Sequence, residues 1–493
     1  MTQDIEQADD RPAPASDVDP ADAARGERRY RFLVAGYSLS SYGTFLNMVA
    51  LNLFVYETTG RALAMGLFMA VRLGSGFLAG LASGGLLSRF TAKSLMLWTN
   101  VAQAAVMLLL VLAPEGLRTA ALMAVSVVVG GCGTIFMVSL RSSIPEMVGD
   151  ERRSWANSLS ITGRSLAMVA GFASAGVVVS LVGYTAAFVV DMATFAVCSV
   201  TVALLPIAGG GGDGKKGAGP EPEDDSDGRE QRPDGEQDGK QDGKPEGTQE
   251  GRPDGKPDRE RSGVPDGKRD GRSGAGRWRM PRTFLASAAA PGLGLMVVLR
   301  GVDAFGSSSH NAALPVYSAG LDTSHPAVFV SAFWCLWALG NVVAQQLIQR
   351  YINRTGRSVG AAGFGYGTCV MSGAFILAFA GFPSAATAVI ALVAGAADGL
   401  TEVSYTSHLQ TLPAELRGHA FGLSATVENL GFGIGMILVA AALDSLSPLT
   451  VVAWSHGVPI VLAAVFLIRV SGPRRRRPPS AAHPGGERGG RVR

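Results

Sequence analysis

The chain has 493 residues, of which 47% are hydrophobic and 17% are charged, and its formal net charge is +3. The charge is unevenly placed, because residues 211–280 hold 33 of the 83 charged side chains. The other 423 residues carry the remaining 50, about 12%, against roughly 25% in soluble proteins. A soluble protein needs a charged surface, so this composition argues against a soluble fold and favours a membrane protein.

Twelve apolar runs follow an N-terminal segment, residues 1–30, that is rich in Asp, Glu, Pro and Arg. That segment lacks an apolar stretch, which predicts a disordered cytoplasmic N-terminus without a cleaved signal peptide. A helix needs about 20 apolar residues to cross a hydrocarbon core of ~30 Å. The runs are continuous and not alternating, so they predict helices and not a β-barrel. The expected spans are 31–56, 63–87, 95–112, 120–140, 159–182 and 184–205 in a first half (residues 31–207), and 284–317, 328–347, 359–380, 385–409, 421–443 and 450–470 in a second half (residues 283–471).

Residues 208–282 separate the two halves and consist largely of Gly, Pro, Asp, Lys and Gln. Such a segment cannot bury enough apolar surface to offset its ordering entropy, which predicts a disordered cytoplasmic linker. Its basic end could attract anionic lipid, but a solvated tether is the interpretation we favour. Residues 472–493 are expected to form a basic cytoplasmic tail. The fold class predicted is an all-α membrane protein with about twelve transmembrane helices in two pseudo-symmetric six-helix halves.

The Lys and Arg residues of the short loops predict the orientation in the membrane, because such residues favour the cytoplasmic side. With the N-terminus inside, the outer loops carry only Arg61 and Arg118. Both termini are therefore expected in the cytoplasm and, in a bacterium, the helices in the inner cell membrane. The basic residues of the inner loops are Arg89, Lys93, Arg141, Arg152, Arg153, Arg350, Arg354, Arg357 and Arg417.

Several ordered segments carry a resemblance to a known family. They are 49–60 (VALNLFVYETTG), 141–159 (RSSIPEMVGDERRSWANSL), 187–191 (AFVVD), 314–317 (LPVY) and 412–418 (LPAELRG). Together they resemble the major facilitator superfamily, and in particular its multidrug, macrolide and siderophore efflux branch. The resemblance implies a transporter that works by alternating access and, for that branch, an exporter.

Departures from the family pattern shift the expected coupling machinery. In the loop between the second and third spans, Gly84, Arg89 and Lys93 are candidates for a conformational role, but Ser88 replaces the usual acid. The acid common in the first span of the branch is replaced by Thr44, and the fifth span lacks the antiporter proline. Arg417 is the matching candidate in the second half. Proton coupling is therefore expected to use acids of the second half.

Ionisable residues within the predicted spans are functional candidates, because each costs about 2.5–3.5 kcal/mol at bilayer depth. Arg300 and Asp303 are three residues apart, a spacing that allows an internal ion pair. Asp398 and Glu402 are four apart on one helical face, where two carboxylates repel each other and favour proton uptake. With Glu428 they form the set of candidates for proton coupling or for the substrate cavity, and purely structural pairing is an equally weighted alternative.

Secondary candidates are Arg72, Asp191, Asn52 and His310. For Arg72 and Asp191 we favour structural pairing, and a lone membrane histidine is more often a packing donor. For Arg164, near a cytoplasmic helix end, snorkelling is a sufficient structural interpretation. The residues expected to supply further hydrogen bonds are Asn47, Asn341 and His408.

Enzyme chemistry is not expected. The phosphate-loop-like run from Gly209 has Lys216 where Ser or Thr must bind magnesium, and the segment 356–360 matches a nucleophile elbow but joins two spans. We predict no catalytic residue, metal site, cofactor or nucleic-acid partner. The favoured function is proton-coupled export of a hydrophobic or amphipathic drug or natural product by a monomer in the lipid membrane. The alternatives are a facilitator or importer and a transporter-like sensor or scaffold.

Overall fold

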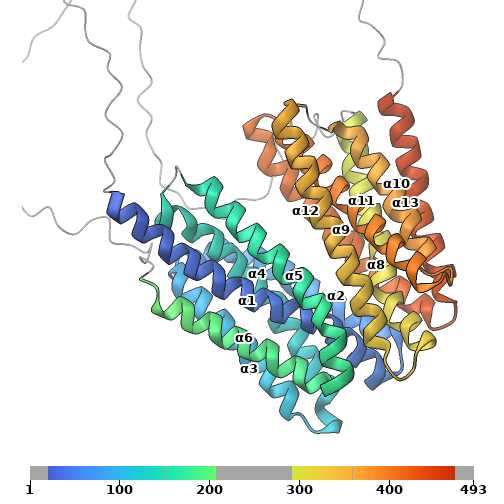
Figure 1. Ribbon diagram of the computed structural model, residues 1–493, viewed down its shortest axis with the longest axis horizontal. Coiled ribbons are helices and arrows are strands. Elements are labelled where there is room, and N and C mark those ends of the chain that lie inside the picture. The colour runs from blue at the N-terminus through green and yellow to red at the C-terminus, as the bar shows by residue number, and fades with distance from the viewer. Residues whose placement is uncertain (1–19, 150–151, 207–290, 358, 472–493) are drawn as a thin grey trace, which may run out of the picture. The chain divides into compact units, whose positions relative to one another are not determined.

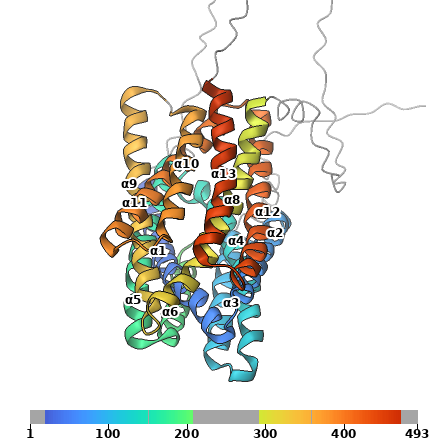
Figure 2. The same cartoon turned by 90° about the vertical axis from the view of Figure 1, so that its right-hand side faces the viewer.

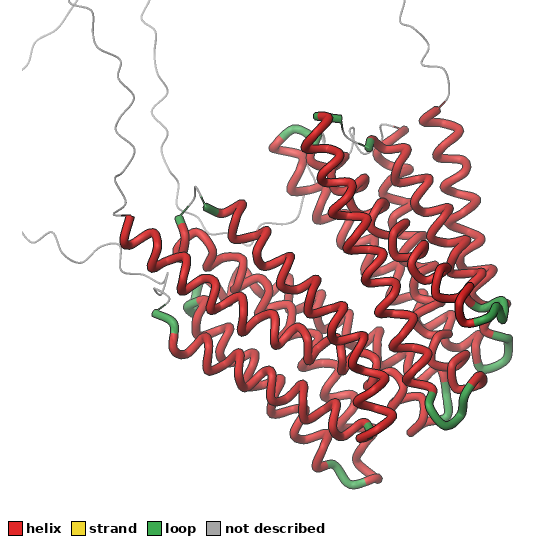
Figure 3. Tube along the Cα trace, in the orientation of Figure 1, coloured by secondary structure: helices red, strands yellow, loops and turns green. Residues whose placement is uncertain are grey.

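The computed structural model describes residues 20–149, 152–206, 291–357 and 359–471, and this part of the chain consists of helices joined by short loops, without a strand (Figure 3). The predicted linker, residues 208–282, and the predicted tail, residues 472–493, lie outside the described residues. The first-half helices are α1 (Pro20–Thr59), α2 (Ala62–Leu87), α3 (Ala92–Leu112), α4 (Arg118–Val148), α5 (Arg153–Val182) and α6 (Tyr184–Leu204), with a short 3-10 turn, Glu115–Leu117, before α4. The second-half helices are α8 (Pro291–Leu321), α9 (Pro326–Thr355), α10 (Gly360–Ala378), α11 (Ser384–Gln410), α12 (Ala414–Leu443) and α13 (Pro448–Ser471).

Each predicted span coincides with one of these twelve helices, which confirms the fold class. Ten of the helices are long and apolar enough to cross a membrane by length and composition. The other two are α1 and α8, the first helix of each half. Their lower apolar content reflects polar side chains such as Asn47 in α1 and Arg300 and Asp303 in α8. Polar groups on a membrane helix face protein or a cavity and not lipid, so α1 and α8 are expected near the centre of the molecule.

Helix α1 begins at Pro20 and not at residue 31, so residues 20–30, expected to be disordered, are helical. The charged side chains of this segment stabilise the helix, because Glu27 pairs with Arg31 (3.3 Å) and with Arg152 at the start of α5. Tyr30 is fully buried, and its hydroxyl donates to the carbonyl of Ala156 (3.1 Å). Residues 1–19 lie outside the described residues.

The two halves pack in the same way. In the first half α1 contacts α5 and α6, α2 contacts α4, and α3 contacts α4 and α6 (Figure 1). In the second half α8 contacts α12 and α13, α9 contacts α11, and α10 contacts α11 and α13 (Figure 2). Counting six helices from α1 and six from α8, the two sets of contacts correspond helix by helix. Between the halves, the pairs α5–α9 and α2–α12 also correspond, so the packing is pseudo-symmetric as predicted.

The halves share a hydrophobic core at one end of the helices only. We call this the joined end; α1, α5, α8 and α12 end there and α2 and α9 begin there. The shared core contains Phe68 and Phe172 of the first half and Phe333 and Met436 of the second. At the opposite end, the separated end, the first half has a core around Tyr30 and Phe136 and the second half has its own around Phe364 and Phe466.

Close backbone approach fastens the joined end. The hydroxyl of Ser331 in α9 accepts from the backbone N–H of Gly176 in α5 (2.8 Å) and donates to the carbonyl of Phe172. A Cβ at Gly176 would lie 2.8 Å from that of Ser331, so only glycine allows this contact. On the other side, Asp444 after α12 accepts from the N–H of Ala62 (3.2 Å).

Candidate substrate cavity

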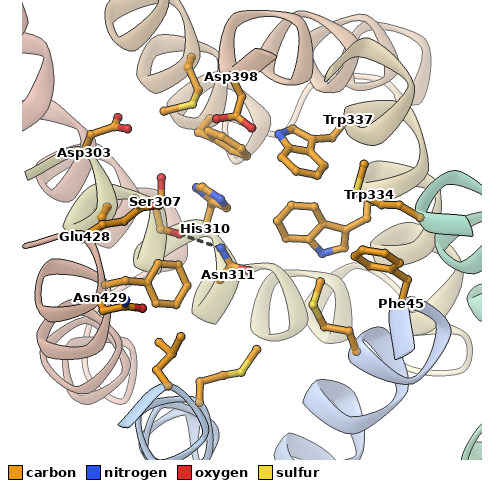
Figure 4. A pocket seen from close by; sticks show the side chains of 18 of the residues that line it. Phe45, Asp303, Ser307, His310, Asn311, Trp334, Trp337, Asp398, Glu428 and Asn429 are labelled. Atoms are coloured by element: carbon orange, nitrogen blue, oxygen red, sulfur yellow. Dashed lines mark hydrogen bonds between the residues drawn. The ribbon is translucent and has the colours of Figure 1, made fainter. Parts of the chain in front are cut away.

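A cavity of about 530 Å³ lies between the halves and is lined by both. Its walls come from α1, α2 and α5 of the first half and from α8 to α12 of the second. Figure 4 shows Asp303 and Glu428 on one side of the view and Phe45, Trp334 and Trp337 on the other. A wall that is mostly apolar with a few charged groups is typical of a small-molecule site. The lining residues are Phe45, Met48, Met69, Arg72, Leu73, Arg164, Met168, Phe172, Arg300, Asp303, Ala304, Ser307, His310, Asn311, Trp334, Trp337, Met371, Phe375, Asp398, Glu428, Asn429 and Phe432.

Arg300 of α8 is the centre of a charge network on the second-half wall. Its guanidinium binds both carboxylate oxygens of Glu428 in α12, at 3.2 and 2.9 Å, and Glu402 in α11 at 2.8 Å. It also lies over the ring of Tyr405, 5.4 Å from the centroid. A two-point guanidinium–carboxylate contact is among the stronger hydrogen-bonded pairs. One cation thus joins three helices of the second half.

The predicted ion pair between Arg300 and Asp303 is wrong, because the arginine pairs with glutamates of two neighbouring helices instead. Spacing within one helix made Asp303 the nearest candidate, but α11 and α12 bring Glu402 and Glu428 within reach of the guanidinium. Asp303 is 4% exposed and lines the cavity. Its Oδ1 atom is buried and has no hydrogen-bond partner among the described residues.

Asp398 and Glu402 of α11 have different partners. Asp398 accepts from the Asn341 amide of α9 (2.9 Å), and Gln345 donates to the Asn341 carbonyl oxygen (2.9 Å). Glu402 binds Arg300, and its side chain is half exposed. The two carboxylates therefore have separate roles. Asp398 is held by an amide and lines the cavity, whereas Glu402 belongs to the arginine network.

His310 of α8 belongs to a buried polar chain that leads away from the cavity. Its Nδ1 lies 3.1 Å from Nε2 of His456 in α13, whose Nδ1 lies 3.1 Å from the Ser372 hydroxyl in α10. The His310 ring stacks on Phe375 with centroids 3.5 Å apart. Our reading of the sequence named His310 but missed His456; a second histidine inside the apolar run of the last helix was the available signal.

The first-half wall carries two arginines, Arg72 of α2 and Arg164 of α5. Among the described residues neither side chain has an ion pair or a hydrogen bond; the guanidinium of Arg164 lies over the Phe45 ring, 5.1 Å from its centroid. Arg164, for which snorkelling was the simple interpretation, is exposed and lines the cavity.

Asp191 and Asn52, two of the secondary candidates, are buried in the first half and do not line the cavity. Asp191 accepts from the Asn47 amide at 2.6 Å. It acts on Arg72 electrostatically without an ion pair between them. Asn52 has a buried carbonyl oxygen without a hydrogen-bond partner in the described part of the chain. Both residues therefore belong to the packing of the first half.

The four conformational-loop candidates lie at the separated end and make their visible contacts within their own halves. Lys93 donates to the carbonyls of Ala203 (3.0 Å) and Leu205 (2.6 Å) at the end of α6. Arg417 donates to the carbonyl of Leu412 (3.2 Å). Gly84 and Arg89 are exposed. In the described residues no hydrogen bond or ion pair joins these candidates across the halves, consistent with the separate cores at that end.

In the described segments, no three or more His, Cys, Asp or Glu side chains are placed so that they could hold a metal ion together. Two like halves of six helices with a cavity between them define the fold of a secondary transporter. The chain matches the Major Facilitator Superfamily over residues 33–436 and again over 296–491, and it belongs to this family. It is thus a multi-pass membrane transporter and not an enzyme.

Solved structures support the fold. A bacterial homologue of the iron transporter ferroportin, described as inward-facing, superposes with a TM-score of 0.60 at 13% identity, covering 91% of this chain and 99% of its own. A variant of the nucleoside transporter NupG gives 0.57 at 13%, covering 90% and 99%. A bacterial homologue of the lysosomal transporter Spinster, inward-facing and unoccupied, gives 0.57 at 14%, covering 92% and 96%. No curated protein matches the chain.

Proposed function

We propose that this protein is a proton-coupled exporter of a hydrophobic or amphipathic small molecule, such as a drug or natural product, as the efflux-branch segments suggest. The observation that carries the proposal is the surplus of acids in the second half. Arg300 is one cation, while Asp303, Asp398, Glu402 and Glu428 are four potential anions around it. Uncompensated carboxylates away from water are costly, and proton uptake removes that cost. Antiport requires a group that binds a proton when the cavity opens to one side of the membrane and releases it when the cavity opens to the other.

Asp303 is the acid we propose as the main proton carrier. It faces the cavity, its Oδ1 is buried without a partner, and it lies one helical turn from Arg300. In the ionised form it depends on the charge of Arg300, which is already shared with two glutamates. A bound substrate that moves Arg300 changes the electrostatic support for ionised Asp303. Asp303 then takes up or releases a proton. Asp398, held by Asn341, is the second candidate.

The difference between the two ends supports alternating access. The joined end is fastened by Ser331 and Gly176 and by the shared core, while at the separated end each half has its own core. The basic loop residues Arg89, Lys93, Arg354 and Arg417 lie at the separated end. The positive-inside rule therefore supports a cytoplasmic separated end, cytoplasmic termini and an inward-facing state in a bacterial inner membrane.

The experiment is dye transport by the purified full chain in liposomes with an acidic lumen. Rhodamine 6G and sulforhodamine B are amphipathic xanthene dyes of opposite net charge, and neither changes charge over the pH range used. We expect at least one dye to accumulate in the lumen with the gradient and to stop when a protonophore is added. Equal uptake with and without the gradient would indicate a facilitator, and protein-free liposomes give the background.

The sensor or scaffold alternative has its own test. The described helices contain the whole cavity, so deletion of residues 211–276 should leave dye transport within about twofold of the full chain. The measurement is the initial rate of uptake at matched protein density. Complete loss of transport in the deleted chain would favour a role for that segment beyond connecting the halves.

A further inference from the structure

Positive charge on the first-half wall is not balanced as it is on the second-half wall. Arg300 has two carboxylate partners, whereas Arg72 and Arg164 face the same cavity with no ion pair or hydrogen bond to any described residue. Among the described residues, the guanidinium of Arg164 lies over the Phe45 ring, and Asp191 acts on Arg72 electrostatically without an ion pair. Arg72 is partly buried, and an arginine at bilayer depth costs about 2.5–3.5 kcal/mol unless a partner compensates it. Arg164 is exposed, so its guanidinium is open to a ligand in the cavity. Two cations on one wall of the cavity point to a ligand that supplies negative charge.

The depths of the two arginines differ. Arg72 is ten residues from the start of α2, and Arg164 is eighteen residues from the end of α5. At ~1.5 Å per residue they lie about 15 and about 27 Å from the joined end. Arg164 is therefore the cation closer to the separated end and Arg72 the deeper one. A ligand that enters from the separated end meets Arg164 first and Arg72 second.

An aromatic surface runs beside these cations. Phe45 packs on Phe172 with centroids 5.3 Å apart, Phe172 stacks with Trp334 at 5.9 Å, and Trp334 meets Trp337 at 5.3 Å. All four residues line the cavity. Ring faces of this kind bind flat aromatic groups, and they also hold the guanidinium of Arg164 by a cation–π contact.

We propose that Arg72 and Arg164 form an anion-recognition wall, so that the exported substrate is an aromatic amphipathic molecule with a carboxylate, sulfonate or phosphate group. The aromatic part packs along Phe45, Phe172 and Trp334 while the anionic group binds the arginines. This assignment rests on the proposed function only because it takes the cavity as the substrate site. It adds that the cavity prefers anionic to cationic substrates, although the opposite wall carries acids.

The test compares the binding of sulforhodamine B and rhodamine 6G by fluorescence anisotropy to the purified full chain in phosphatidylcholine nanodiscs. The wild type should bind the anionic dye more tightly than the cationic one. Charge-assisted contacts support a loss of about tenfold in affinity for sulforhodamine B on R72Q or R164Q. The same variants should leave the affinity for rhodamine 6G unchanged or increase it. R72K and R164K keep the charge and should restore part of the affinity.

R118Q is the matched control, because Arg118 is a half-exposed residue that pairs with Glu115 (3.5 Å) outside the cavity. This variant should bind both dyes like the wild type. Size-exclusion profiles and melting temperatures verify that each variant is folded. Equal affinity of wild type and both Gln variants for sulforhodamine B overturns the proposal. A second outcome also overturns it. If phosphatidylglycerol displaces the dye and the Gln variants then bind like the wild type, the arginines hold a lipid headgroup and not the substrate.

Failure of this inference can be told from failure of the proposed function. Gradient-driven transport of rhodamine 6G with no preference for sulforhodamine B in binding removes the anion-recognition wall and leaves a proton-coupled exporter. Selective, arginine-dependent binding of sulforhodamine B without gradient-driven transport of either dye keeps the wall and removes the exporter.

Discussion

In the first half α1 packs against α5 and α6, and in the second half α8 packs against α12 and α13 in the same way, yet the charges that face the cavity differ. The second half surrounds Arg300 with acids and holds Asp398 through Asn341. The first half presents Arg72 and Arg164 without acidic partners, and keeps Asp191 in its interior. Matched packing therefore does not require matched chemistry.

This contrast suggests a division of work. A movement of one half against the other needs two rigid bodies of similar shape, and the corresponding helix contacts provide them. Coupling to protons needs acids that can change charge, and these lie in the second half. Recognition of the substrate needs groups that lack a partner until it binds, and the first half supplies two. The following substitutions test that division, beginning with the largest expected effect.

Arg300→Gln should have the largest effect, because it leaves Glu402 and Glu428 without their common cation. We expect gradient-driven dye uptake to fall by about 100-fold and the melting temperature to decrease, since removal of one member of a buried pair leaves the others uncompensated. The glutamates are half exposed, which moderates the loss of stability. Arg300→Lys keeps the charge but not the two-point contact and should be intermediate. Full activity of Arg300→Gln would contradict the proposed network.

Asp303→Asn should separate coupling from transport. The amide cannot carry a proton, so we expect uptake against a concentration gradient to fall by more than about tenfold while downhill exchange of dye continues. Both rates are measured in the same liposomes, with and without the pH gradient. Glu115→Gln, at an exposed position outside the cavity, is the control and should behave like the wild type. If Asp303→Asn still concentrates the dye, the proton carrier is a different residue.

Ser331→Ala removes the hydroxyl that joins α9 to α5 at the joined end. A buried hydrogen-bond partner contributes about 1–2 kcal/mol, so the balance of conformations should shift by about 5- to 30-fold toward states with that end open. The measurement is the distance between two spin labels, one on a joined-end loop of each half. Labels are not placed at Gly176, because a side chain there would collide with Ser331. Ser180→Ala, whose hydroxyl bonds only within α5, is the matched control. Identical distance distributions would show that Ser331 does not fasten the joined end.

His456→Phe should have the smallest effect on transport. The substitution removes the partner of His310 and of the Ser372 hydroxyl, so we expect a lower melting temperature and a change in uptake of less than about threefold. Thermal unfolding and initial uptake rates measure the two effects separately. A loss as large as that of Asp303→Asn, with the fold intact, would place the histidine pair in the coupling machinery.

Span length predicted the helices well, because each run must by itself supply enough apolar residues to cross the membrane. The helical segment 20–30 was missed because Glu27 and its arginine partners hold it outside the apolar region, where hydropathy gives no signal. The pairing of Arg300 was missed because its partners come from α11 and α12, and spacing along α8 contains no information on them.

Other polar contacts were predicted in part. Asn47 and Asn341 were expected to add hydrogen bonds, and both do, to Asp191 in the interior of the first half and to Asp398 in the cavity wall. Arg164 was assigned to a helix end because distance along α5 does not reveal which residues face the second half. Helix order and composition therefore predict the scaffold, while the charge partners depend on rotation and packing of helices that are far apart in the sequence.

The most direct test of the central claim is a measurement of proton movement driven by the substrate. Liposomes that contain the full chain and a pH-sensitive dye start without a pH gradient, and sulforhodamine B or rhodamine 6G is then added outside. An antiporter must release lumenal protons as the dye enters, so the lumen should become alkaline in the wild type and stay unchanged with Asp303→Asn. Entry of the dye into wild-type liposomes without any change of lumenal pH would contradict the account.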